Sequence, residues 1–309
     1  MHRLLAVAVL ALGLAAPVGQ TAEELDLVAV AAVSDQLCEE SFREMMARER
    51  RLIEVSTRVR RAAVSLCGEK LAPVFGLQII SVRDVPLEFI TPAIRAFALG
   101  EGAYVAAVLD DSASARAGIT RGDRIVSIDA FPVENAWDVQ TRRAKAGAGS
   151  LRFVVEREGK RVDVDVPNEP GCYYQPFLAL SPAWNAFASR GQRSIVVYSE
   201  LVRASKTDDE LAMVIGHELG HIILAHDSSA PRAEADADYF GAYAIALAGY
   251  DPAAGSRVWA ALARSKVSSL VSYGTHPSAP ERTLAIERAV EEIGAKRAAG
   301  SALAPQGLR

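Results

Sequence analysis

The sequence His-Glu-Leu-Gly-His at His217–His221 combines the side chains in this chain that are best suited to catalysis. Residues four apart lie one turn apart on one face of a helix, so both imidazoles can reach a single metal ion while Glu218 projects beside it. In a metallopeptidase with this spacing the ion polarises a carbonyl and a water molecule, and the glutamate accepts a proton from the water. The pattern therefore predicts metal-assisted peptide hydrolysis with Glu218 as the general base.

A second acidic cluster, Glu-Ala-Asp-Ala-Asp at Glu234–Asp238, follows at the start of the next expected helix. A catalytic zinc ion takes three protein ligands and leaves one position open, so we expect Glu234 to be the third ligand. Asp238 lies one turn further on and is expected to accept the second ring N–H of a ligand histidine. Two imidazoles and a carboxylate suit zinc, which predicts one Zn²⁺ per chain. Two histidines on a buried helix can also be hydrogen-bonded core residues, and this alternative stays open.

Several helices and two strands are needed to position these residues. Thr207 and Glu210 have the spacing of a capping box, which predicts that the helix of the histidines begins at residue 208 and runs to 226. Periodic apolar residues predict an amphipathic helix from Phe42 to Leu66. Further helices are expected at residues 231–248, 252–266 and 279–298, and strands at Asn185–Ala188 and Ile195–Tyr198.

Residues 73–168 differ in character from the rest, because short β-rich runs alternate there with Gly, Pro and Asp turns. The stretch YVAAVLDDSASARAGITRGDRIVSIDAFPVENAWDV resembles a PDZ domain, with Gly118 and Gly122 in turns and Asp123 closing the second turn. The resemblance implies binding of an extended peptide, often a C-terminus, by strand addition, with the binding loop at residues 75–79. A β-module that only packs against the rest of the chain is the alternative.

Four segments resemble the zinc endopeptidases that include the HtpX-like membrane proteases and the type I CAAX prenyl protease. They are WNAFASRGQRSIVVYSELV, DDELAMVIGHELGHIILAH, EADADYFGAYAIALAGYDP and THPSAPER, which together cover nearly all of residues 180–285. The resemblance implies a gluzincin site with His217, His221 and Glu234 on zinc. It also implies a strand near the site, here residues 185–188, that aligns the substrate backbone.

The same resemblance singles out His276 and Arg282, the basic residues of its late motif. It implies that they polarise the scissile carbonyl, or that His276 closes the open zinc position as a gate, and a purely structural role is equally open. The chain departs from the family in having only twelve residues between His221 and Glu234, where many members carry a long hairpin.

These patterns predict an α+β fold, in which a mainly helical zincin-type domain with a small sheet is split by an inserted, β-rich PDZ-like domain. Residues 23–72 and 169–298 would form the peptidase domain, residues 73–168 the PDZ-like domain and residues 299–309 a disordered tail. Cys67 and Cys172 bracket the insertion, so we favour a disulfide between them that would leave Cys38 free.

The N-terminus predicts export from a bacterial cytoplasm. His2 and Arg3 precede an apolar run and then small residues, as in a signal peptide, with cleavage expected after Ala22 and an uncleaved anchor as the alternative. No later stretch is apolar enough to cross a membrane, so we expect a mature chain without a membrane span in the periplasm or outside the cell. The net charge of −4 carries no basic footprint for nucleic acid.

The leading interpretation is a zinc endopeptidase that hydrolyses exported, unfolded or damaged proteins, with the PDZ-like domain recruiting or gating substrate. The alternative is a PDZ-bearing chaperone or binding protein with a structural zinc site, against which Glu218 argues, because a structural site needs no general base. A latent enzyme held shut by His276 on zinc differs from the first only in regulation.

Overall fold

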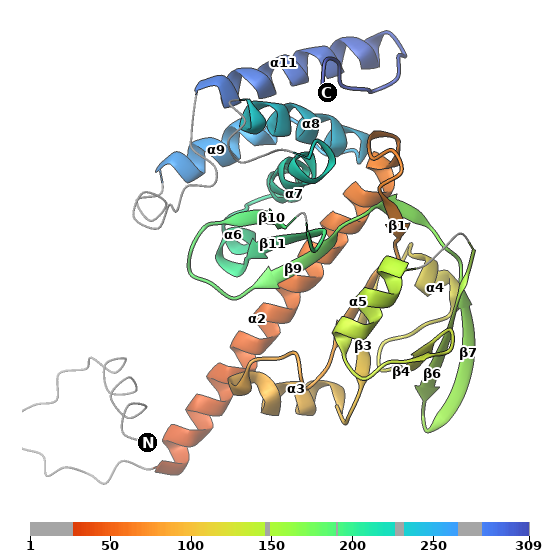
Figure 1. Cartoon of the computed structure of the whole chain (residues 1–309). Helices are drawn as coiled ribbons and strands as arrows, with labels where there is room; N and C mark the ends of the chain where they lie inside the picture. The colour runs from red at the N-terminus through yellow and green to blue at the C-terminus, as the bar shows by residue number, and fades with distance from the viewer. Residues whose placement is uncertain (1–26, 146–148, 190, 226–231, 265–279, 309) are drawn as a thin grey trace, which may run out of the picture.

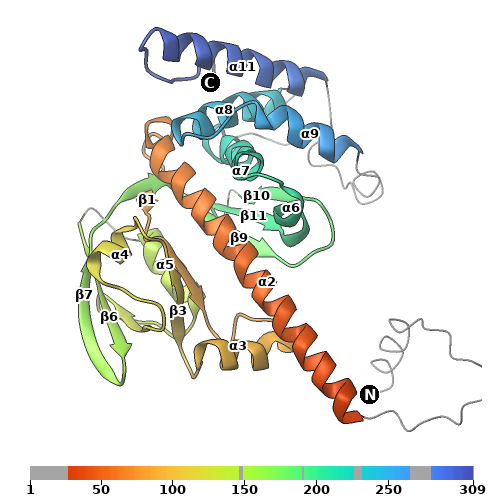
Figure 2. The ribbon, with the colours of Figure 1, turned by 180° about the vertical axis from the view of Figure 1, so that it is seen from behind.

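The computed structural model of the chain describes residues 27–145, 149–189, 191–225, 232–264 and 280–308. Helix α2 (Leu27–Ala62) runs diagonally through the molecule, with a β-rich domain along one side and a small sheet along the other (Figures 1 and 2). The remaining large helices are stacked at the C-terminal end of α2. The predicted signal peptide, residues 1–22, and His276 lie outside the described residues.

Helix α2 is longer than the predicted helix and continues as a short 3₁₀ helix, η1 (Ala63–Leu66). Its buried residues recur every three or four positions, as expected for a helix that packs one face on a core. Phe42 and Met45 in the N-terminal half pack against the β-rich domain. Val55 and Val59 in the C-terminal half pack against the helical domain. The helix is therefore shared by the cores of both halves of the molecule.

The helical domain consists of five helices and a three-stranded sheet among the residues that the structure describes. The helices are α6 (Ser199–Ala204), α7 (Asp208–Ile223), α8 (Ala233–Leu247), α9 (Ala254–Arg264) and α11 (Pro280–Ala298). The sheet has the order β10–β11–β9, with β9 (Gln175–Ala179) parallel and β10 (Ala186–Ser189) antiparallel to β11 (Ser194–Tyr198). These elements agree with the strands and helices predicted for residues 185–298.

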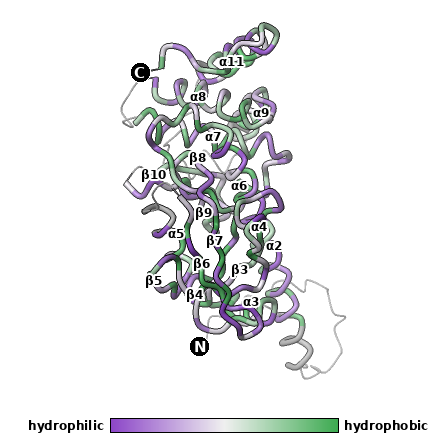
Figure 3. The backbone as a smooth tube through the Cα atoms, turned by 90° about the vertical axis from the view of Figure 1, so that its right-hand side faces the viewer, coloured by the Kyte–Doolittle hydropathy of each residue, from purple (hydrophilic) through white to green (hydrophobic). Residues whose placement is uncertain are grey.

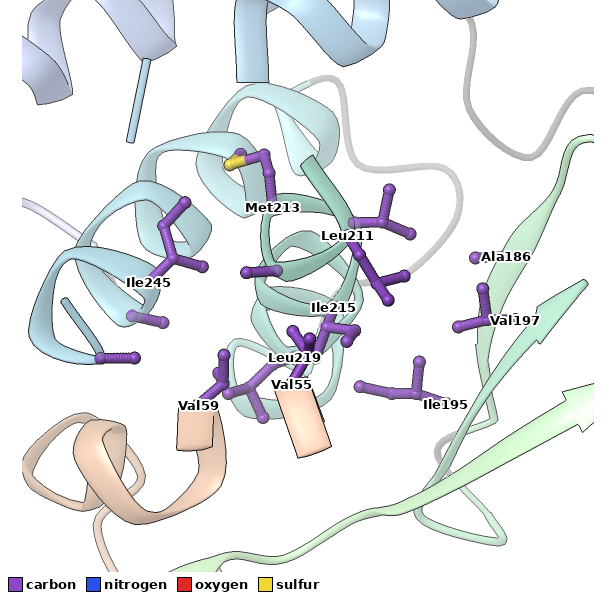
Figure 4. Close-up of a cluster of buried hydrophobic side chains, with 14 of the residues drawn as sticks. Val55, Val59, Ala186, Ile195, Val197, Leu211, Met213, Ile215, Leu219 and Ile245 are labelled. Atoms are coloured by element: carbon purple, nitrogen blue, oxygen red, sulfur yellow. The ribbon is translucent and has the colours of Figure 1, made fainter. Parts of the chain in front are cut away.

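Helix α7 lies at the centre of this domain. Its apolar residues Leu211, Ile215 and Leu219 are buried against α2 on one side and against the sheet on another, as Figure 4 shows. The Thr207 hydroxyl caps the helix by accepting a hydrogen bond from the Glu210 N–H at 3.3 Å, as its capping-box spacing predicted. Because α7 is surrounded by other elements, the histidines that it carries have little freedom to move.

The β-rich domain is an antiparallel sheet in the order β2–β3–β4–β6–β7, with β5 (Phe131–Pro132) paired to β4. Its strands are β2 (Leu77–Ile80), β3 (Ala103–Val108), β4 (Arg124–Ile128), β6 (Leu151–Arg157) and β7 (Lys160–Val166). Its helical segments are η2 (Leu87–Phe89), α3 (Ile90–Phe97), α4 (Ala113–Ala117) and α5 (Ala136–Lys145). The domain has its own hydrophobic core around Phe75, Ile125 and Phe153. The predicted mixed fold with an inserted β-rich domain is confirmed.

The predicted turn chemistry of this domain is also confirmed. Gly118 ends α4 with φ 90°, and Gly122 has φ 92°, both in the region that glycine adopts most readily. The Asp123 carboxylate accepts a hydrogen bond from the backbone N–H of Thr120 at 2.9 Å and so closes the turn before β4.

The chain passes between the two domains twice, and these two crossings lie side by side. Strand β1 (Leu71–Pro73) pairs antiparallel with β8 (Pro170–Cys172), and the Cys67–Cys172 disulfide lies next to this ladder. The favoured disulfide pairing is therefore confirmed, and Cys38 is free. The buried Arg60 of α2 donates to the carbonyl oxygens of Cys172 and Pro73 at 2.9 and 3.3 Å, which ties both crossings to α2.

The C-terminal segment corrects one expectation. We expected disorder from residue 299 onward, but the backbone N–H of Gln306 donates to the Tyr239 hydroxyl at 3.1 Å, and Leu308 packs on the main core. Hydrophilic and hydrophobic residues are mixed along the preceding helix α11 (Figure 3). None of the described helices is both long and apolar enough to span a bilayer.

Candidate metal centre

The candidate site lies where α7 and α8 come into backbone contact at glycine residues. An ideal Cβ built on Gly220 of α7 would lie 2.9 Å from the Cα of Ala237 in α8. A Cβ on Gly216 would lie 2.9 Å from the carbonyl oxygen of Gly241. Only residues without a side chain allow this approach. It brings the acidic N-terminal turns of α8 within reach of the histidines of α7.

Three predicted ligands meet at this crossing. The Nε2 atoms of His217 and His221 lie 3.1 Å apart, and each is 3.5 Å from a carboxylate oxygen of Glu234. Tetrahedral zinc with bonds of about 2.0–2.1 Å would place its ligand atoms about 3.3 Å apart. Among the described residues these three form the group of His, Cys, Asp or Glu side chains that can hold a metal ion. The donor set and its spacing therefore fit zinc.

Glu218 lies beside these ligands in the sequence and is buried, with 2% of its surface exposed. A carboxylate on the helix that carries both histidines is held at a fixed distance from a metal bound by them. This placement agrees with the role of general base that the spacing of the motif predicts.

Behind the ligands, Asp238 fixes the orientation of His217. Its Oδ1 atom lies 2.8 Å from His217 Nδ1, so the ring hydrogen on Nδ1 points to the carboxylate, and Nε2, which must be free of hydrogen when a metal is bound, faces the other ligands. Burial alone would raise the pKa of Asp238, but the charge of His217 and hydrogen bonds from Arg282 and His217 lower it. Asp238 is therefore a buried carboxylate anion that supports a metal ligand.

The pKa of His217 in the metal-free protein is raised to about 9. Burial lowers this pKa, but the charge of Asp238 and hydrogen bonds to Asp238 and Glu234 outweigh burial. The same carboxylates that favour a proton on the imidazole favour a metal cation in its place, so metal binding must release this proton.

Arg282 lies against the carboxylates of Asp238 and Glu234. Its Nε and Nη2 atoms lie 2.7 and 2.9 Å from the two carboxylate oxygens of Asp238, and Nη1 lies 3.2 Å from Glu234. The residue is buried, with 3% of its surface exposed. A guanidinium engaged by two carboxylates supports the ligands, which agrees with the structural role that the sequence left open beside the expectation that it polarises a substrate carbonyl. His276, its partner in that expectation, lies outside the described residues.

Trp259 of α9 is a site residue that the sequence did not single out. Its ring packs edge to face against His217, with 5.2 Å between the centroids, and the Arg282 guanidinium lies 4.1 Å from its centre. An aromatic residue on an amphipathic helix is ordinarily a core residue, so no local pattern distinguished it. It closes the apolar side of the network formed by His217, Asp238 and Arg282.

Strand β10 lies next to α7 and corresponds to the strand expected to align substrate. In the described sheet it pairs with β11 along one edge, which leaves the other edge unpaired. An unpaired edge offers backbone groups to which an extended peptide can add as a further strand.

Comparison with known proteins agrees with this geometry. Residues 149–232 match peptidase family M48. The match includes His217, Glu218 and His221 but ends two residues before Glu234, so the third ligand rests on the structure. Residues 73–167 match the PDZ domain family. The chain thus combines an M48-type segment with a PDZ domain, and the predicted class, a zinc metalloendopeptidase, is supported.

Two curated relatives resemble parts of the chain. The mitochondrial metalloendopeptidase OMA1 of Arabidopsis thaliana is 27% identical over 38% of this chain and 32% of that protein. The Mesorhizobium japonicum protein mll0638, named as a zinc metalloprotease, is 45% identical over 19% of this chain and 16% of that protein. The chain thus spans a third or less of the length of either relative.

Two solved structures are similar to part of the chain. The HtrA3 PDZ domain bound to a phage-derived ligand is 21% identical, covers 32% of this chain and 88% of that one, and has a TM-score of 0.27. The HtrA-type protease AlgW with a decapeptide is 26% identical, covers 34% and 31%, and has a TM-score of 0.28.

Proposed function

We propose that this protein is a zinc-dependent endopeptidase of the HtpX-like kind that acts on exported, unfolded or damaged polypeptides. The observation that carries the proposal is the spacing of His217, His221 and Glu234 at 3.1 to 3.5 Å, with Glu218 on the same helix. The match of residues 149–232 to peptidase family M48, which includes both histidines and Glu218, supports it. A structural zinc site would have no use for Glu218.

The chain's own residues supply positioning and proton transfer. A bound zinc ion would act as a Lewis acid toward a substrate carbonyl and would lower the pKa of a water molecule. Glu218 takes a proton from the attacking water and delivers it to the nitrogen of the leaving amine. Asp238 keeps the His217 ring in its ligand orientation, and Arg282 keeps Asp238 and Glu234 in place.

The substrate is proposed to bind in extended form along β10. Main-chain hydrogen bonds to a strand edge do not depend on sequence, which suits an enzyme that acts on many unfolded chains. The PDZ-like domain would recruit or gate such chains.

The proposed location outside the cytoplasm rests on the N-terminal composition, and the Cys67–Cys172 disulfide supports it, because such bonds persist in oxidising compartments.

The test is cleavage of a permanently unfolded model protein by the purified chain, with bound zinc quantified. Glu218→Gln should retain zinc and lose activity by about 10²- to 10⁴-fold, because it removes the proton acceptor and leaves the ligands in place. Glu291→Gln, which changes an exposed glutamate on α11, is the matched control and should cleave as the parent does. Zinc bound without cleavage by the parent would favour a binding or chaperone function instead.

A further inference from the structure

The peptide-binding groove of the PDZ-like domain is covered by the peptidase part of the same chain, which comprises α2 and the helical domain with its small sheet. In a PDZ domain an extended peptide adds to the edge strand of the sheet. The corresponding edge here is β2, which in the described structure pairs with β3 alone. Leu77 and Ile79 of β2 and Val139 of α5 line a cavity whose outer walls are Ile53 of α2 and Phe177 of β9.

The space left in this groove is small. The cavity has a volume of about 50 Å³, which is about a third of the 150 Å³ of an apolar cavity known to bind a single benzene ring. A peptide strand with its side chains therefore does not fit while α2 and β9 remain in place.

Both polar and apolar contacts hold the groove closed. The Gln78 amide donates from β2 to the Met46 carbonyl oxygen at 3.1 Å and to the Glu49 carboxylate at 2.7 Å, both on α2. Gln78 is 3% exposed, so these bonds lie inside the interface. On the other side, the rings of Trp137 of α5 and Phe177 of β9 stack with centroids 6.1 Å apart. Each wall of the groove is thus fastened to the peptidase part.

The charge at one end of the cavity indicates which ligand the groove would take. Arg60 lines the cavity together with Gly76 and is buried, with 2% of its surface exposed. Burial lowers the pKa of Arg60 to about 10, so the guanidinium stays charged at neutral pH. Within the described part of the chain its side-chain hydrogen bonds go to the carbonyl oxygens of Cys172 and Pro73, and no carboxylate forms an ion pair with it. Glu49 also lines the cavity, but it accepts a hydrogen bond from Gln78, and burial raises its pKa and so disfavours its charged form. A buried cation without a counter-charge suits the carboxylate of a peptide C-terminus.

Arg60 also lies where the two domains are joined. Its two acceptors belong to the paired strands β1 and β8, next to the Cys67–Cys172 disulfide. The contacts of Gln78 and Trp137 lie outside this junction. Movement about β1 and β8 can therefore open the groove while Arg60 stays near Gly76, provided that Phe42 and Met45 of α2 also separate from the β-rich domain.

We propose that closure of the groove by α2 and β9 excludes a polypeptide C-terminus, and that binding of such a C-terminus releases the PDZ-like domain from the peptidase part. If the proposed function holds, this release is regulatory, because β9 belongs to the same sheet as β10, the strand next to the metal centre. The protein would then change its activity when a chain terminus occupies the groove.

The test measures peptide binding to the full mature chain carrying Glu218→Gln, so that no probe is cleaved. The probe is a pool of fluorescein-labelled decapeptides ending in Val, Leu, Ile or Phe with a free carboxylate, and an amidated pool serves as its control. Phe177→Ala removes the stacking partner of Trp137 from the peptidase side. It should tighten binding of the free-carboxylate pool about fivefold, because closure competes with the ligand. Phe131→Ala, which removes an aromatic ring outside the cavity, should leave binding unchanged.

A second measurement does not depend on the variants. On addition of the free-carboxylate pool to the Glu218→Gln chain, amide hydrogen exchange should rise in residues 175–179, because the PDZ-like domain no longer packs against β9. Binding without such a rise, binding of the amidated pool equal to that of the free pool, or no gain in Phe177→Ala would overturn the proposal. None of these readouts needs catalysis, so a parent chain that fails to cleave protein would refute the proposed function and leave the closure intact.

Discussion

Substituting Gly220 with alanine tests the claim that a backbone contact between α7 and α8 creates the metal centre. The added Cβ would lie 2.9 Å from the Cα of Ala237, whereas carbon atoms in contact prefer about 3.5–4.0 Å. The neighbouring atom is backbone, so it cannot rotate away. The helices must therefore separate by about 0.6 Å or more at this point.

A displacement of this size is large for a metal site. Ligand distances in such sites hold to within about 0.2 Å, and Glu234 lies on α8, three residues before Ala237. Moving α8 moves Glu234 and Asp238 away from the histidines of α7. We expect zinc affinity to fall at least about tenfold, as it does when supporting contacts of a metal site are lost. Overpacking should also lower the free energy of unfolding by about 1–3 kcal/mol.

The assay is competition for zinc between the protein and a chelator of known affinity, combined with urea unfolding of the metal-free form. Gly294→Ala is the matched control, because Gly294 is helical and exposed, and its added Cβ meets no atom within 4 Å. It should leave zinc affinity unchanged and stabilise the fold by about 0.5–1 kcal/mol. A Gly220→Ala protein that binds zinc as tightly as the parent would refute the argument that this contact sets the ligand geometry.

Three further predictions concern the same site and the domain junction. Asp238→Asn should weaken zinc binding about 10- to 100-fold in the same competition assay. The control variant Asp236→Asn, on the same helix, should leave zinc binding unchanged, and equal effects of the two variants would contradict the role given to Asp238. Zinc affinity should rise about tenfold per pH unit between about pH 6 and 8, because His217 has a pKa raised to about 9 without metal and must lose its proton on binding. A flat pH profile in the chelator titration would show that no such proton is released. Replacing both Cys67 and Cys172 with serine opens a loop with a sequence separation of 105 and should cost about 2–5 kcal/mol in urea unfolding; an unchanged midpoint would argue against a stabilising disulfide.

Much of the candidate site followed from helical periodicity. His217 and His221 are one turn apart, and so are Glu234 and Asp238, so each pair was predictable as a unit facing one direction. Gly118 adopts positive φ without a steric cost, and Asp123 accepts a hydrogen bond from the nearby backbone, so both residue types favour turns by themselves. The PDZ-like pattern of turns was therefore recognisable in the sequence. The position of the two cysteines around the insertion was likewise sufficient to favour their pairing.

The sequence alone thus determined the local elements, the residue types of the site and the order of the domains, because these depend on neighbours within a few positions. The tertiary structure decided which distant surfaces meet. The contact of Arg282 with Asp238, the packing of Trp259 on His217 and the closure of the PDZ-like groove by Phe177 all join segments far apart in the chain. Such contacts depend on how the helices and sheets pack together, and no local pattern of residues specifies them.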